Sequence, residues 1–242
     1  MSCYTYDRNN KYYDEPHSPV SLEKMLSSKT INKGKFLSRQ HAESYLDQMQ
    51  VISSLSSVRS ILEIGPGEGF CQKNLKSLDY YYDTLDSESI YNPTFCSDFR
   101  HFDASKCDNE YDLVCAFQVL EHFPYESFTF LINKMVCMSN KYLFISIPYS
   151  CFGIRLNFNI HFGQFTFCDK KIEYYFPSKK RNRKYRDQYV QEFPWAVHYW
   201  EVGRKGFDIN MIINDIESCE LKIVDKFHGS NPFHYFLLCE RT

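Results

Sequence analysis

The chain has 242 residues, 43% of them hydrophobic and 17% aromatic, and a formal net charge of −2 at pH 7. This length suits one domain with an elaboration, and the composition supplies a core and excludes a low-complexity disordered chain. A charge so close to zero gives no reason to expect nucleic acid or an anionic membrane as a general partner.

The ten cysteines include no C-x-x-C pair, which predicts reduced thiols rather than a disulfide framework or a zinc site. The first twenty residues are polar and tyrosine-rich, unlike a secretory leader. No apolar run approaches the roughly 18 residues that a membrane span needs. We therefore expect a cytoplasmic protein without a membrane span.

From residue 41 to residue 150, helical and strand patterns alternate along the chain. Apolar residues recur at helical spacing in three segments, which are 41–52, 70–77 and 128–136. Apolar runs of strand length fall between them, at 60–64, 80–85, 94–99, 111–117 and 142–147. This order predicts a parallel, doubly wound α/β sheet whose ligand lies outside the carboxyl ends of the strands.

The alternation stops over residues 151–205, which are aromatic and basic and have no clear periodicity. Regular patterns return with a predicted helix at 208–216 and predicted strands at 221–227 and 234–239. We therefore read 151–205 as an insertion before the last helix–strand unit.

A glycine-rich loop follows the first predicted strand. Three glycines, Gly65, Gly67 and Gly69, occupy alternate positions, and Glu63 precedes them by two residues. Glycine lets a ligand lie directly against the backbone. A dinucleotide-binding loop would place its third glycine at position 70, which is Phe70 here, so the spacing departs from that pattern.

The stretch Glu-Ile-Gly-Pro-Gly-Glu-Gly at 63–69 resembles the first motif of class I S-adenosylmethionine-dependent methyltransferases. Later motifs follow in the order of that family. Asp86 closes the second strand, Asp98 follows in Ser-Asp-Phe, and residues 111–122 resemble the fourth strand with the turn after it. The resemblance covers residues 40–150 well and the C-terminal part in outline.

The resemblance implies a Rossmann-like, mostly parallel, seven-stranded sheet with an antiparallel last strand, and a small cap from the insertion. The domain organisation that we predict has four parts: a polar N-terminal segment at 1–40, the S-adenosylmethionine-binding core at 41–150, the insertion as an acceptor cap at 151–205, and the rest of the core at 206–242.

S-adenosylmethionine, with S-adenosylhomocysteine as its product, is the cofactor that the resemblance implies. One carboxylate, Asp86, can accept from both ribose hydroxyls, and Asp98 suits the adenine amino group. Glu63 suits the methionine ammonium group or the sulfonium, and the aromatic rings can wall the adenine. The predicted cofactor-binding residues are Glu63, Gly65, Gly67, Gly69, Asp86, Asp98, Phe99, Phe117 and Gln118. The alternatives are a plain tight turn for the glycines and helix caps for the acids.

Transfer of a methyl group to a hydroxyl needs a group that removes the hydroxyl proton, and histidine is suited to this by its ordinary pKa of about 6.5. The predicted catalytic residues are Glu121, His122 and His198, and His161 is a weaker candidate in the insertion. A backbone-bonded helix residue is the alternative for His122. Some O-methyltransferases that resemble this chain hold a divalent metal, but the Glu121–His122 pair lacks a third ligand in the sequence, so we expect no metal.

The acceptor is the least determined part of the prediction. The turn at 120–122, Ile-Pro-Tyr at 147–149 and His-Tyr-Trp-Glu-Val-Gly at 198–203 resemble methyltransferases of bacterial surface-polysaccharide synthesis. We therefore expect O-methylation of a small-molecule or carbohydrate acceptor, such as a nucleotide-linked sugar. The alternatives are an RNA or protein methyltransferase, for which the basic run at 179–186 is the only motif, and a non-catalytic S-adenosylmethionine-binding module. The sequence leaves the oligomeric state open.

Overall fold

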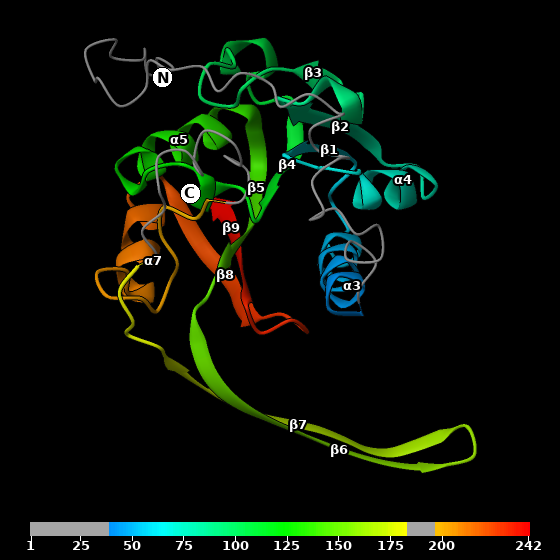
Figure 1. The fold of residues 1–242 in the computed structure, drawn as a ribbon. Helices are drawn as coiled ribbons and strands as arrows, with labels where there is room; N and C mark the ends of the chain where they lie inside the picture. Colours follow the sequence, from blue (N-terminus) through cyan, green and yellow to red (C-terminus); the bar gives the residue numbers. More distant parts are fainter. Residues whose placement is uncertain (1–38, 183–196) are drawn as a thin grey trace.

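The computed structural model describes residues 39–182 and 197–242, so the predicted segment 1–40 lies almost wholly outside it. Its main feature is a seven-stranded sheet in the order β3-β2-β1-β4-β5-β9-β8 (Figure 1). The strands of this sheet are β1 (Ser60–Ile64), β2 (Tyr81–Asp86), β3 (Phe95–Cys96), β4 (Tyr111–Phe117), β5 (Ser139–Pro148), β8 (Leu221–His228) and β9 (His234–Arg241).

The sheet is parallel from β3 to β5. The last strand of the chain, β9, lies between β5 and β8 and runs antiparallel to both. A short connection between β8 and β9 allows that antiparallel pair, whereas parallel neighbours need a longer crossover. The predicted mostly parallel sheet with an antiparallel last strand is confirmed.

Helices cover both faces of the sheet (Figure 1). One face carries α3 (Arg39–Ser54) and α4 (Phe70–Lys76), and the other carries α5 (Phe128–Met138) and α7 (Ile209–Glu217). Each face has its own hydrophobic cluster, and the strands between the two clusters are buried on both sides. This explains why the strand segments read as nearly continuous apolar runs.

Two predicted strands differ from the observed ones in extent. The predicted strand at 94–99 is only Phe95–Cys96 in the structure, because Asp98 begins a turn with Arg100. The predicted strand at 142–147 begins earlier, at Ser139. Its first three residues are polar, which hid it from an apolar pattern, yet Ser139 is fully buried opposite Tyr111.

The first part of the insertion is a long two-stranded hairpin that forms a sheet of its own. Its strands, β6 (Cys151–Phe162) and β7 (Phe165–Pro177), extend from the body as an arm (Figure 1). The expectation that this stretch lacks periodicity was wrong, because β6 alternates apolar and polar residues over its whole length. The residues of β7 are mixed, and its pairing with β6 shifts register after Ile160, so the second strand has no such pattern in the sequence.

The chain returns from the insertion beside the carboxyl ends of β4 and β5. Val202 donates to the carbonyl of Pro148 at 2.9 Å, and its own carbonyl accepts from Ser150 at 2.8 Å. Trp200 is fully buried, and its indole N–H donates to the carbonyl of Phe123 at 3.1 Å. The end of the insertion is therefore fixed to the sheet, while the basic run from residue 183 onward lies outside the described residues.

The nine cysteines in the described ranges are free thiols, in agreement with the prediction of reduced cysteines. Among the helices in those ranges, none is long and apolar enough to cross a membrane.

Candidate functional site

The glycine loop after β1 has a backbone that only glycine adopts readily. Gly65, Gly67 and Gly69 have φ angles of +66°, +53° and +67°, and Gly69 directly precedes α4. L-residues with a side chain are strained in this left-handed region. The predicted glycine turn is therefore present, and its spacing follows from the backbone conformation.

Gly65 and Gly67 differ in the space beside their Cα atoms. A Cβ at Gly65 would lie 2.6 Å from Cγ2 of Val119, in the turn after β4, so the loop and that turn are in close contact. A Cβ at Gly67 would meet no atom within 4 Å. Gly65 is thus required for packing between neighbouring strand ends, and Gly67 borders open space that a ligand can enter.

Glu63 is buried at the end of β1, where it is 5% exposed. The hydroxyl of Tyr82 donates to its Oε2 at 2.8 Å. Burial raises the pKa of Glu63 to about 7, the Tyr82 hydrogen bond opposes the shift, and the nearby Asp86 adds to it. A cationic group placed beside Glu63 would reverse this shift.

Asp86 lies at the end of β2, next to the glycine loop. Its Oδ1 accepts from the amide of Glu88 at 2.9 Å. Burial raises the pKa of this carboxyl, although the amides of Glu88, Gly67 and Ser87 stabilise its charge. Asp86 and the glycine loop therefore border the same space, as the sequence predicted for a ribose-binding acid.

Asp98 already has a strong partner within the chain. Arg100 donates to it from its amide and its guanidinium group, with distances of 2.5 to 3.2 Å and contacts to both carboxylate oxygens. The pKa of Asp98 is lowered, because this pairing outweighs the burial that would raise it. An adenine amino group would have to share oxygens that accept four hydrogen bonds, which is about the capacity of a carboxylate.

The remaining predicted cofactor residues differ in accessibility. Phe99 is only 4% exposed and belongs to the core, with the Lys134 ammonium 5.7 Å from its ring centroid. Phe117 is half-buried at the end of β4. Gln118 has a φ of +56° and donates from Nε2 to Oγ of Ser146 at 3.2 Å. Such a strained non-glycine backbone at a strand end is typical of a functional turn.

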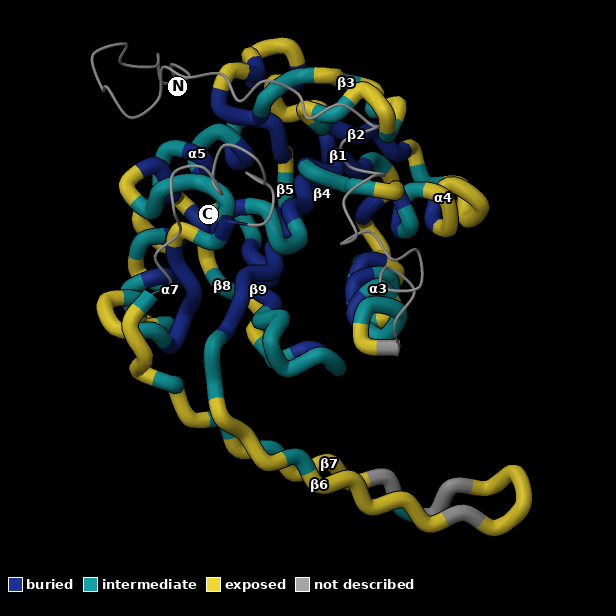
Figure 2. Tube along the Cα trace, viewed as in Figure 1, coloured by how far each residue is buried: buried dark blue, intermediate teal, exposed yellow. Residues whose placement is uncertain are grey.

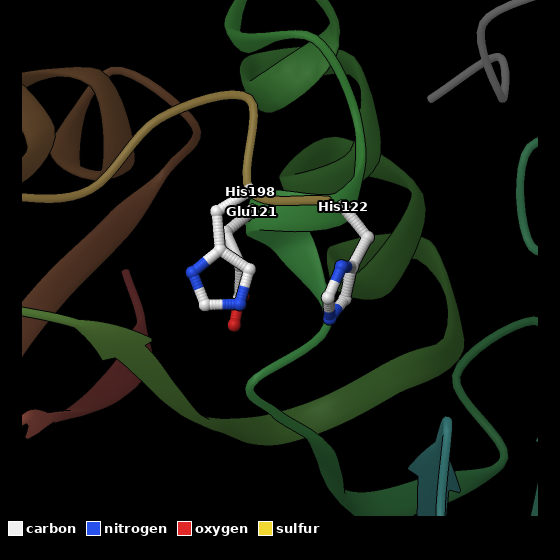
Figure 3. A group of neighbouring side chains, drawn as sticks. All are labelled: Glu121, His122 and His198. Atoms are coloured by element: carbon white, nitrogen blue, oxygen red, sulfur yellow. The ribbon is translucent and has the colours of Figure 1, made fainter. Parts of the chain in front are cut away.

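The three predicted catalytic residues lie together, although 76 positions separate His122 from His198. Glu121 and His122 belong to a single 3-10 turn after β4, Leu120–His122, and His198 lies in the segment that returns from the insertion. The amide of Tyr199 donates to the carbonyl of Glu121 at 2.9 Å, which joins the two segments. Figure 3 shows the three side chains pointing to the same side of the backbone.

Distances within this group are short. One ligand atom from each of Glu121, His122 and His198 lies within 4.8 Å of the others. The imidazole rings of His122 and His198 have centroids 5.1 Å apart and are nearly perpendicular. His198 thus supplies the third candidate ligand that the sequence did not reveal, and we call these three residues the Glu-His-His cluster.

Glu121 is fully buried, and neither carboxylate oxygen has a hydrogen-bond partner among the described residues. Burial raises the pKa of Glu121 to about 8, and the negative charge of Glu201 contributes to the shift. A buried polar group without a partner destabilises a fold by about 1–3 kcal/mol, and more when it is charged. Such a group needs a specific reason to be retained.

Both histidines are oriented by hydrogen bonds at Nδ1. Nδ1 of His122 lies 2.8 Å from the carbonyl of Val197. Burial and the neighbouring His198 lower the pKa of His122 to about 4. Nδ1 of His198 lies 3.3 Å from Oε1 of Glu201.

Glu201 and Arg204 support His198 and were not among the predicted site residues. Glu201 is buried, and its second oxygen accepts from the guanidinium of Arg204. These partners lower the pKa of Glu201 in spite of its burial. The i, i+3 spacing of His198, Glu201 and Arg204 was the only signal in the sequence. His161 lies apart from this group, on β6 of the arm.

Comparison with known proteins supports the fold through structure alone. No protein-family model and no curated protein sequence matches the chain. The magnesium protoporphyrin IX methyltransferase of Synechocystis PCC 6803, solved with bound S-adenosylmethionine, matches with a TM-score of 0.54 and 12% identity, over 91% of this chain and 89% of that one.

Two further solved structures match to a similar degree. The N-methyltransferase NodS of Bradyrhizobium japonicum WM9, in complex with S-adenosylhomocysteine, has a TM-score of 0.54 and 12% identity, over 84% of this chain and 88% of that one. Mitomycin 7-O-methyltransferase MmcR has a TM-score of 0.54 and 9% identity, over 93% of this chain and 61% of that one. The chain has the class I S-adenosylmethionine-dependent methyltransferase fold, and the predicted resemblance is confirmed at the level of the fold.

We predict that Gly65→Ala lowers the free energy of unfolding by about 3 kcal/mol, because left-handed strain adds to overpacking against Val119. Gly67→Ala is the matched control. It has the same backbone strain but open space around its Cβ, so it loses only about 1 kcal/mol. Urea denaturation measures both values, and equal losses in the two variants would contradict the tight contact at Gly65.

Proposed function

We propose that the protein is an S-adenosylmethionine-dependent methyltransferase that acts on a hydroxyl of a small acceptor, with carbohydrate as the acceptor class. One observation carries the proposal. The glycine loop with Asp86 and the Glu-His-His cluster meet through the contact between Gly65 and Val119, which lies two residues before Glu121. This contact supports a donor site and a proton-accepting site that would adjoin near the carboxyl ends of β1 and β4, where this class of sheet binds its ligands.

The residues present fit S-adenosylmethionine. Open space at Gly67 admits a ligand against the backbone, and Asp86 can accept from two neighbouring hydroxyls. Glu63 is buried and has no cationic partner among the described residues, so an ammonium or sulfonium group suits it. When bound, the cofactor supplies an activated methyl group with a good leaving group attached.

For this reaction the protein must align the methyl donor with the acceptor hydroxyl and accept a proton, and it need not form a covalent bond with either substrate. Asp86 and Glu63 would hold the cofactor, which would supply its methyl group to the acceptor oxygen and leave as a neutral thioether, while the hydroxyl proton would pass to a base of the chain. Holding donor and acceptor in line and removing that proton are the tasks of the chain. His198 is the better placed base, because the contact with Glu201 orients its ring, whereas burial lowers the pKa of His122.

A carbohydrate acceptor rests on the resemblance of three motifs around the cluster, at 120–122, 147–149 and 198–203. The structure gathers these motifs, since Tyr149 forms a bridge with Val202 and the amide of Tyr199 donates to the carbonyl of Glu121. The solved structures of similar fold include enzymes named for a porphyrin and for mitomycin, which are small molecules. A cytoplasmic location, where nucleotide-linked sugars are made, belongs to the same proposal.

The test is methyl transfer from radiolabelled S-adenosylmethionine to a panel of nucleotide-linked sugars, small hydroxylated metabolites and RNA. We expect label in a carbohydrate fraction. Transfer to RNA alone would contradict the acceptor class. Binding of S-adenosylhomocysteine without transfer to any acceptor would favour a non-catalytic module.

Asp86→Asn should weaken S-adenosylhomocysteine binding by about 10- to 100-fold, because a hydrogen bond to a charged group contributes about 1.5–3 kcal/mol. Isothermal titration calorimetry measures the affinity. Asp108→Asn, at an exposed position beyond the site, is the control and should bind as the parent does. Equal affinity in the parent and Asp86→Asn would remove Asp86 from the cofactor site.

Binding should also depend on pH through Glu63. Below a pH of about 7 the free protein carries a proton on this residue, and an ammonium group beside it expels that proton. The affinity for S-adenosylhomocysteine should therefore fall by up to about tenfold for each pH unit below that value. In the free protein, the contribution of Glu63 to stability is complete below its ordinary pKa of 4.5 and is lost as the pH rises through about 7.

Glu63→Gln is the matched variant for this pH dependence, since it keeps the shape of the side chain and removes the titration. We expect weaker binding at pH 8 and a flat profile between pH values of about 5 and 7. An unchanged slope in Glu63→Gln would show that another group releases the proton.

A further inference from the structure

We propose that the Glu-His-His cluster is a binding site for one divalent transition-metal ion. The site brings together Glu121, His122 and His198. Two imidazoles with one carboxylate are a ligand set that suits Zn²⁺, Fe²⁺, Mn²⁺ or Co²⁺ better than Mg²⁺ or Ca²⁺.

The distances suit a metal after small side-chain adjustments. The three ligand atoms lie within 4.8 Å of one another. Ligands at about 2.0–2.2 Å from one ion are about 3–4 Å apart, so rotations of side chains that already point to the same side suffice (Figure 3).

A second, independent observation points to a cation. Glu121 is 0% exposed, and both of its oxygens lack a partner among the described residues. The neighbouring acid Glu201 cannot supply positive charge, and Arg204 is engaged by Glu201. A dication on Glu121 would give the buried carboxylate both a partner and a compensating charge.

The surroundings of the histidines also match those of metal ligands. A metal-binding histidine usually makes a hydrogen bond from its second ring nitrogen to a carbonyl or a carboxylate, which fixes the ring. Here Nδ1 of His122 lies 2.8 Å from the Val197 carbonyl, and Nδ1 of His198 lies 3.3 Å from the Glu201 carboxylate. Three protein ligands leave further coordination positions for water or an acceptor.

The role of the ion rests on the proposed function. A hydroxyl bound to a divalent cation loses its proton more readily. His198 would then serve as a ligand instead of the base proposed above, and the hydroxyl proton would pass to a water molecule.

The experiment measures metal content and binding in the full chain. After treatment with a chelator, the protein is titrated with Co²⁺, Zn²⁺ and Mn²⁺, and the bound metal is counted by mass spectrometry after desalting. We expect one ion per chain, an absorption band of protein-bound Co²⁺, and thermal stabilisation by the metal. Glu121→Gln and His198→Ala should each weaken binding by about 10-fold or more. His101→Ala, which removes an exposed histidine elsewhere, should keep the site.

Measurements of stability and of S-adenosylhomocysteine binding separate loss of the metal site from misfolding and from loss of the proposed function. Glu121→Gln removes an unpartnered buried carboxylate, so without metal it should be at least as stable as the parent. Metal binding without S-adenosylhomocysteine binding would overturn the proposed function and support the site. S-adenosylhomocysteine binding with no metal bound by the parent at micromolar concentration would overturn the site and leave His198 with Glu201 as the base.

A separate observation concerns the arm, and from it we infer a homodimer. The β6–β7 hairpin is exposed along most of its described length (Figure 2). The residue pairing shows that one of its two faces is almost entirely apolar. The paired residues on this face, here called the apolar arm face, are Phe152 with Phe176, Ile154 with Tyr174, Leu156 with Ile172, Phe158 with Lys170, Ile160 with Cys168 and Phe162 with Phe165.

Within residues 39–182 and 197–242, the protein body does not cover the apolar arm face, because the opposite face contacts the body. Arg155, on that opposite face, donates to the carbonyls of Gly229 at 2.7 Å and Ser230 at 2.6 Å, and pairs with Glu173. The Tyr175 ring packs against His228. A two-stranded hairpin is at best marginally stable alone in water, so an uncovered apolar face calls for a partner.

The exposed area suits a second copy of the chain. Six aromatic side chains on this face are 52–76% exposed, and with their aliphatic neighbours they present on the order of 1,000 Å². A monomer rarely exposes more than about 300–600 Å² in one patch, and a stable dimer buries about 800 Å² on each partner. Two such faces complement each other in a twofold contact, since apolar residues meet apolar residues along the whole arm.

The charge within the two strands of the arm gives no attraction to an anionic membrane. The arm carries Arg155, Lys170 and Lys171 against Asp169 and Glu173, so its charges nearly cancel. Binding to an anionic lipid surface is typical of clustered basic residues beside an apolar face.

Sedimentation velocity at micromolar protein concentration tests the dimer. We expect the parent to sediment as a dimer and Phe158→Glu to sediment as a monomer, because a charge would be buried in the contact. Asn157→Glu, the neighbouring residue on the opposite face, is the matched control and should remain dimeric. A monomeric parent would overturn the inference, and co-sedimentation of that monomer with phosphatidylglycerol vesicles would assign the face to lipid instead.

Discussion

The close approach of Gly65 to Val119 is the contact on which the arrangement of the site depends. It joins the loop after β1 to the turn after β4, and a side chain at position 65 would push the two apart. The glycine loop leads to Asp86 at the end of β2, and the turn leads to Glu121 and His122. One contact between backbone and a branched side chain thus sets the separation of the two halves of the site.

Two buried glutamates oppose the stability of the fold. Burial raises the pKa of both Glu63 and Glu121. Their situations differ, because Glu63 accepts a hydrogen bond from Tyr82, while Glu121 has no partner among the described residues. Each is at the carboxyl end of a central strand, so each is placed where a cationic ligand would relieve its burial.

Much of the fold followed from the sequence, because continuous apolar runs and helical spacing are local signals. Ser60–Ile64 and Tyr111–Phe117 were predicted to the residue. The arm was missed, since the mixed residues of β7 give no period of two and its pairing with β6 shifts register after Ile160. Among the predicted cofactor residues, Asp86 adjoins the loop as expected, but Asp98 is occupied by Arg100 and Phe99 is buried in the core.

The sequence by itself determined the succession of strands and helices along the core and the glycine turn. Each of these depends on residues only a few positions apart. Only the tertiary structure decided which groups surround Glu121. His198 is 77 residues away from it along the chain, and it reaches the cluster because buried Trp200 and the bridge from Val202 fix the returning segment to the sheet. The tertiary structure likewise decided which face of the arm is uncovered. Long-range packing sets both outcomes, and no local pattern records it.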